Sequence, residues 1–166
     1  MSAHPRDQAA LYGATGNDRG DERRGRCDVR GKVERRNLTV ALDTNVLIRL
    51  MVEDDKAQLV IARDLLSRDC SISATVLLEV EWVLRSFYRW PREVIAESLG
   101  EIIDLPTVSV SPTGVRWAID RFAQGADLAD MMHIASALGA TAFATFDRQV
   151  GRHAGANSPV PIETLA

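Results

Sequence analysis

The chain has 166 residues, of which 46% are hydrophobic and 26% charged, with a formal net charge of −3. This length and mixture are typical of one globular domain. No apolar run approaches the roughly 18 residues of a membrane-spanning helix, and no signal peptide opens the sequence. We therefore expect a cytoplasmic protein with no membrane partner. Two cysteines are too few for a disulfide framework or a zinc site.

Charge is divided unevenly along the chain. Residues 1–37 hold only 10 hydrophobic residues, five of the eleven glycines and a net charge of +3, whereas the rest carries −6. Because the first segment has too little apolar surface to offset the entropy of ordering it, we predict a flexible N-terminal extension or an over-extended translation start over residues 1–37. The folded domain is predicted over residues 38–166. Arginines of the extension could contact nucleic acid, but a solvated tail is the simpler interpretation.

The first half of the folded part begins with a short apolar run. Thr39–Asp43 is typical of a buried strand of a parallel sheet, and a helix follows over residues 44–52. Helical spacing predicts a second helix over about residues 56–67. Cys70–Ser73 is predicted as a short strand that leads into a helix over residues 75–88.

The second half continues this alternation. Pro91 opens a helix to about residue 105, since a proline in the first turn forfeits a hydrogen bond that the helix start lacks anyway. The further predicted elements are a weak strand over 108–110, helices over 112–124 and about 128–140, a strand over 142–146, and an edge strand near residues 159–163. Strands separated by helices imply parallel crossovers, so we predict an α/β fold, a three-layer α/β/α sandwich with a mainly parallel central sheet.

Ligands of such sheets bind beyond the carboxyl ends of the strands, where two aspartates are expected. Asp43 ends the first predicted strand, and Asp147 follows the strand over residues 142–146. For Asp43, capping of the next helix is as good an interpretation as function. For Asp147 the alternative is an ordinary turn aspartate.

Glutamates on the helix over residues 75–88 differ in their setting. Helical spacing places Glu79 beside Val76, Val80 and Val83, on the face that the sheet should cover. A carboxylate there must be paired, protonated or bound to a metal, and a buried pair with an arginine is the alternative to function. Glu81 precedes Arg85 by four residues, which predicts an exposed ion pair.

Asp127 and Asp130 lie three residues apart on one side of a helix start. Asp127 resembles an N-cap, an interpretation that we weigh equally with function. Asp130 lies one turn further in, where capping does not explain it. Carboxylates gathered at one sheet edge repel one another and need a compensating cation. Oxygen ligands without cysteine favour Mg²⁺ or Mn²⁺.

Four blocks carry a resemblance to a known family. They read LDTNVLIRL at 42–50, LLEVEWVLRS at 77–86, ADLADMMHIASA at 126–137 and ATFDRQV at 144–150. In this order they resemble PIN-domain ribonuclease toxins of the VapC family, from VapBC toxin–antitoxin systems, over about residues 39–166. The resemblance implies an acidic site whose members are Asp43, Glu79, Asp130 and Asp147, with Asp127 as an extra acid and Asn45 and Thr145 as supporting polar residues.

The resemblance and the acids together predict hydrolysis of RNA phosphodiester bonds with Mg²⁺ or Mn²⁺. Asp43, Asp130 and Asp147 are the predicted metal ligands, and Glu79 would orient the attacking water or support a ligand. Either Asn45 or Thr145 would fix a carboxylate by a hydrogen bond. The resemblance also implies an RNA substrate, a VapB-like antitoxin partner and a homodimer.

Arginine, histidine and tryptophan side chains are further candidates for contacts with RNA. Because the folded part is acidic, RNA binding needs local arginines, and the candidates are Arg49, Arg85, Arg89, Arg148 and Arg152. The histidines His133 and His153 are better interpreted as surface or structural residues. The tryptophans Trp82, Trp90 and Trp117 could stack on bases, but helical spacing favours core or dimer contacts.

Three other functions remain as alternatives. A receiver-like signalling module would need a lysine late in the chain, and the only lysines are Lys32 and Lys56. A catalytically silent PIN-like module that binds RNA or protein should have lost acids, whereas every matching position is filled. A flap-nuclease-like activity on DNA would need helical elements for which the chain has no room.

Overall fold

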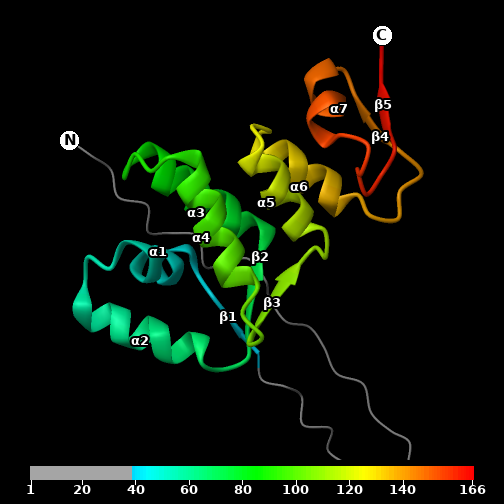
Figure 1. Cartoon of the computed structure of the whole chain (residues 1–166). Coiled ribbons are helices and arrows are strands. Elements are labelled where there is room, and N and C mark those ends of the chain that lie inside the picture. Colours follow the sequence, from blue (N-terminus) through cyan, green and yellow to red (C-terminus); the bar gives the residue numbers. More distant parts are fainter. Residues whose placement is uncertain (1–38) are drawn as a thin grey trace, which may run out of the picture. The chain divides into compact units, whose positions relative to one another are not determined.

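The computed structural model describes residues 39–166, coloured from cyan to red in Figure 1. This part of the chain forms five strands and seven helices. In chain order they are β1 (Val40–Ala41), α1 (Thr44–Val52), α2 (Lys56–Leu66), β2 (Cys70–Ser73), α3 (Ala74–Ser86), α4 (Arg92–Ile103), β3 (Val108–Ser111), α5 (Val115–Ala123), α6 (Leu128–Ser136), β4 (Phe143–Thr145), α7 (Arg148–Ala154) and β5 (Ile162–Thr164). The extension predicted over residues 1–37 lies outside the described residues.

Every strand pairing within residues 39–166 is parallel. β2 is the middle strand of a three-stranded sheet, with Cys70 opposite both Val40 of β1 and Val108 of β3. β4 pairs with β5, where Phe143 lies opposite Ile162. The predicted α/β sandwich with parallel strands and helices is confirmed. The pairing differs from prediction in one respect, because these strands divide between two sheets instead of forming one central sheet.

Amphipathic helices and the middle strand supply the core. Cys70 and Ile72 of β2 point inward at alternate positions. α5 packs against α4 and α6, and α1 packs against α2 and α3. Large side chains that are fully buried include Leu47, Leu77, Leu99, Phe122, Met131 and Ile134. Burying one such side chain contributes about 2 kcal/mol, so the core holds in place the helix starts that carry the acids.

Polar N-cap residues fix where five of the helices begin. The side chain of each accepts a backbone N–H from the first turn. They are Asp43, Asp55, Ser73, Asp127 and Asp147, before α1, α2, α3, α6 and α7 respectively. The capping interpretations of Asp43 and Asp127 therefore describe the observed structure.

Two elements near the candidate site differ from prediction. The first strand was predicted to be buried, but β1 has only two residues and both are exposed. The helix α7 was not predicted. It has seven residues with Gly151 among them, too few to show an apolar stripe, although its capping aspartate Asp147 marks its start.

Two other helices are shorter than predicted. α5 begins at Val115 instead of residue 112, because residues 112–115 form a turn in which the N–H of Val115 bonds to the carbonyl of Pro112 at 3.2 Å. α6 ends at Ser136 instead of about residue 140. The chain leaves the helix in a turn that contains Gly139 at φ +96°, a conformation that glycine adopts without strain.

Candidate functional site

Asp43 lies between β1 and α1, at the carboxyl end of its strand. Its Oδ2 accepts hydrogen bonds from the backbone N–H of Asn45 at 3.4 Å and from Asn45 Nδ2 at 3.2 Å. Asn45 thus makes the bond to a carboxylate that the sequence suggested for it. Capping leaves Asp43 able to bind a metal ion, because the cap orients the carboxylate and uses only one of its two oxygens.

Thr44 connects this helix start to α3. Its hydroxyl is buried and donates a hydrogen bond of 2.6 Å to Oε2 of Glu79. Glu79 is therefore held by a hydroxyl and not by an arginine, which removes the ion-pair alternative. No role is predicted for Thr44 from the sequence. A threonine directly after a capping aspartate is the signal that could have identified it, because a buried hydroxyl needs a partner.

A second group of acids gathers where α6 and α7 begin. Asp127 Oδ1 accepts the N–H groups of Ala129 at 2.9 Å and Asp130 at 3.2 Å. Asp147 Oδ1 accepts the N–H of Gln149 at 2.7 Å. We call Asp127, Asp130 and Asp147 the α6–α7 carboxylate group.

Electrostatics show that the three members of this group interact. The pKa of Asp130 is raised above its usual value, first by burial and then by the negative charges of Asp127 and Asp147. The nearby His133 and His153 oppose this shift. A carboxyl group with a raised pKa beside two other carboxylates is a position at which a cation would be stabilised.

No arginine neutralises the candidate acids. Six ion pairs form among residues 39–166, and none of them includes a predicted site residue. The pKa of Arg85 is raised first by its hydrogen-bonded partner Glu81 and only to a smaller extent by the charge of Asp127. In the same part of the chain, each capping aspartate of the site keeps one oxygen without a hydrogen bond.

The strands that precede Asp43 and Asp147 belong to different sheets. Asp43 follows β1 of the three-stranded sheet and Asp147 follows β4 of the two-stranded sheet, so the expected single central sheet does not carry both. Within residues 39–166, no three His, Cys, Asp or Glu side chains are placed to hold one metal ion together. The donor chemistry nevertheless fits Mg²⁺, which commonly binds through one or two carboxylates and keeps several waters. The predicted ligand set of Asp43, Asp130 and Asp147 stays a prediction.

The two glutamates of α3 have the opposite burial from that predicted. The buried stripe of this helix consists of Leu77, Val80, Glu81 and Leu84, so it is rotated from the predicted one. Glu79 is exposed, and its predicted burial is wrong. Glu81 is only 7% exposed, although its predicted ion pair with Arg85 forms at 2.6 Å. The apolar side chains on both sides of the stripe misled the periodicity argument.

Thr145 plays a different part from Asn45. Its Oγ1 accepts the backbone N–H of Asp147 at 3.0 Å and so fixes the turn between β4 and α7. Within the described residues it makes no hydrogen bond to a carboxylate oxygen, so of the two alternatives Asn45 is the one that bonds to a carboxylate. The Thr145 bond still determines where Asp147 lies.

The candidate RNA-binding side chains also separate into two sets. Arg49 is paired with Asp54, and Arg85 with Glu81. Among residues 39–166, Arg89, Arg148 and Arg152 make no hydrogen bond or ion pair. Trp82 is 59% exposed, whereas Trp90 and Trp117 pack against the core.

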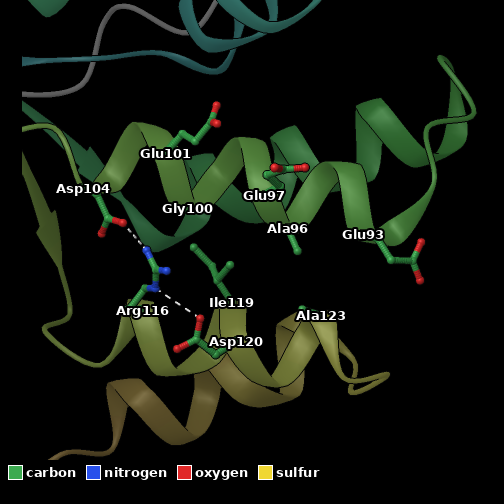
Figure 2. A pocket seen from close by; sticks show the side chains of 10 residues that line it. All are labelled: Glu93, Ala96, Glu97, Gly100, Glu101, Asp104, Arg116, Ile119, Asp120 and Ala123. Carbon is green, nitrogen blue, oxygen red and sulfur yellow. Dashed lines mark hydrogen bonds and ion pairs between the residues drawn. The ribbon is translucent and has the colours of Figure 1, made fainter.

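A groove of about 410 Å³ lies between α4 and α5 (Figure 2). Five acids line it, and they are Glu93, Glu97, Glu101, Asp104 and Asp120. Arg116 donates hydrogen bonds to both Asp104 and Asp120, as the dashed lines in Figure 2 show. The groove contains no predicted site residue, and its negative charge would repel a nucleic acid.

Comparisons with known proteins bear on this geometry. A family model described as the PIN domain matches residues 40–156, which include all the candidate acids. No curated protein and no solved structure matches the chain significantly. Within the described residues, no helix is long and apolar enough to cross a membrane. PIN domains are generally metal-dependent nucleases. On the extent of the family match, the chain belongs to the PIN-domain family.

Proposed function

We propose that this chain is a divalent-metal-dependent endoribonuclease and the toxin of a type II toxin–antitoxin system. The observation that carries the proposal is the α6–α7 carboxylate group. Its members are near enough to raise the pKa of Asp130, and no arginine is paired with them within the described residues. Because the ionised form of Asp130 is disfavoured in this group, a bound cation would stabilise it, which suits a metal site.

The proposed roles follow from the contacts of each side chain. Asp43, Asp130 and Asp147 would hold Mg²⁺ or Mn²⁺, directly or through water. When bound, the ion would lower the pKa of water and offset charge on the phosphate oxygens. Glu79, held by Thr44, would orient the attacking water or support a ligand. Asn45 keeps Asp43 in one orientation.

The direct test is cleavage of total RNA by the full chain in Mg²⁺, Mn²⁺ or EDTA. We expect cleavage only with a metal, and its loss in Asp43→Asn and in Asp130→Asn with folding retained. Asp120→Asn, in the α4–α5 groove, is the matched control and should cut normally. Equal cutting in EDTA would exclude the proposed mechanism.

A catalytically silent binding module is the second candidate. It is favoured by one observation, that no three side chains within residues 39–166 form a metal cluster. The same assay separates the two functions. A silent module would bind RNA or protein equally well with and without metal and would cut nothing.

The toxin role and the partners form the finer part of the proposal. Large apolar side chains stay exposed on α2 and α3, namely Val60, Ile61 and Trp82. Such surface is typical of protein contacts and supports a homodimer and a VapB-like antitoxin. Induced expression in a bacterial host should arrest growth, and Asp130→Asn should not. Growth arrest by both forms would argue against a nuclease toxin.

A further inference from the structure

The turn between β4 and α7 exposes a phenylalanine beside the candidate site. Phe146 is 76% exposed, and its neighbours Thr145 and Asp147 are fixed by their own hydrogen bonds. An exposed aromatic ring gains nothing from the core. Because the turn is held on both sides, the ring is presented to solvent next to Asp147.

The helix that follows carries two unpaired cations. Among residues 39–166, seven arginines make hydrogen bonds or ion pairs, and the remaining basic side chains are Lys56, Arg89, Arg148 and Arg152. Arg148 and Arg152 lie four residues apart, on one face of α7. Val150 and Ala154 form its buried face, about 200° around the helix from the arginines.

We propose that Phe146, Arg148 and Arg152 form a binding surface for single-stranded RNA. Phe146 would stack on one base, while the two arginines would contact the neighbouring phosphates. Aromatic rings and basic side chains are the combination that recognises unpaired nucleic acid, since a paired base does not expose its face. This inference rests on the proposed function, because the surface would bring the strand to the α6–α7 carboxylate group.

Local charge also favours this surface. The folded part has a net charge of −6 and repels a polyanion as a whole. The acids of the candidate site add to that repulsion, which the two cations of α7 would partly offset. Arg49 and Arg85 are already paired with acids and would have to break those contacts first.

The first experiment measures binding of a fluorescent single-stranded RNA to the full chain in EDTA, by anisotropy. We expect Phe146→Ala to weaken binding about tenfold and Phe146→Tyr to retain it. Phe87→Ala is the matched control, because Phe87 is also 76% exposed but follows α3. It should leave binding unchanged.

The second experiment measures how binding depends on salt. Arg148→Gln combined with Arg152→Gln should reduce the salt slope by about 1.4, since each phosphate contact on a single strand contributes about 0.7. Lys56→Gln combined with Arg63→Gln removes the same charge from α2, which carries no proposed RNA contact, and should leave the slope unchanged. All four residues are exposed, so thermal midpoints should not change.

Cleavage assays keep the outcomes separate. If the unaltered chain cuts RNA with metal but the α7 and Phe146 variants bind like their controls, the inference is overturned and the nuclease proposal stands. If the chain neither binds nor cuts RNA, both are overturned. Unchanged RNA binding by Phe146→Ala, together with a changed oligomeric state, would assign Phe146 to a protein contact instead.

Discussion

Two acidic regions of the described chain differ in what balances their charge. In the α4–α5 groove, Arg116 bridges Asp104 and Asp120, so part of the negative charge is neutralised by the fold itself. In the α6–α7 carboxylate group, burial and the negative charges of Asp127 and Asp147 raise the pKa of Asp130. Acid content alone therefore does not mark a site. The informative feature is a carboxylate that lies near other carboxylates and, within the described residues, forms no ion pair with an arginine.

The largest effect expected from this contrast is on catalysis. Asp147→Asn should reduce RNA cleavage about 100-fold or more, because it removes a proposed ligand while the amide oxygen can still cap α7. Asp104→Asn, in the groove, should leave the rate unchanged. Initial rates with Mn²⁺ measure both. Similar rates for the two variants would contradict the claim that cleavage depends on the α6–α7 carboxylate group and not on the α4–α5 groove.

The free energy of unfolding should depend more on Arg85, whose partner Glu81 is buried, than on Arg116, whose partners are exposed. Arg85→Ala leaves the buried Glu81 without its partner and should destabilise the fold by about 1 kcal/mol, a value reduced because Arg85 itself is half exposed. Arg116→Ala breaks only exposed pairs and should cost less than about 0.5 kcal/mol. Urea unfolding gives both values. A larger loss of stability in Arg116→Ala than in Arg85→Ala would contradict the small contribution expected from exposed ion pairs.

A smaller effect is expected at the start of α1. Thr44→Val removes the hydroxyl that holds Glu79 but keeps the shape of the side chain. We expect a loss of about tenfold in cleavage, with roughly 1 kcal/mol of stability lost with the hydrogen bond. Thr44→Ser should restore both. Failure of serine to restore the rate would mean that Glu79 does not act through this bond.

The smallest effect concerns pH. Because the pKa of Asp130 is raised in the folded state, the fold is favoured while Asp130 keeps its proton, and this advantage is lost as pH rises through the folded-state pKa. Asp130→Asn should thus raise the thermal midpoint by a few degrees at neutral pH. Below the ordinary value near 3.8 the two proteins should match. A lower midpoint at neutral pH would contradict the stated sign.

Local patterns in the sequence were sufficient to locate most elements and to name candidate residues for the site. Capping aspartates and apolar runs locate α1, β2 and α6, and Asp43 and Asp147 each lie two residues beyond the end of a strand. Two-residue β1 and seven-residue α7 are too short for periodicity to describe. Which short strands pair depends on tertiary packing, so the division into two sheets was not predictable.

The reversed burial of Glu79 and Glu81 has a similar origin. Apolar residues occur on both sides of the stripe, and only the packing of α3 against its neighbours selects the buried side. Phe146 was overlooked because its exposure results from the turn at Thr145, not from any pattern. The sequence thus indicates which chemical groups are available, whereas their surroundings depend on tertiary packing.

The most direct test of the central claim is a calorimetric measurement of Mn²⁺ binding to the full chain in the absence of RNA. We predict saturable binding that is lost in Asp130→Asn and retained in Asp120→Asn of the α4–α5 groove. Equal Mn²⁺ binding by both variants, or none by the unaltered chain, would contradict the claim that the α6–α7 carboxylate group receives the cation.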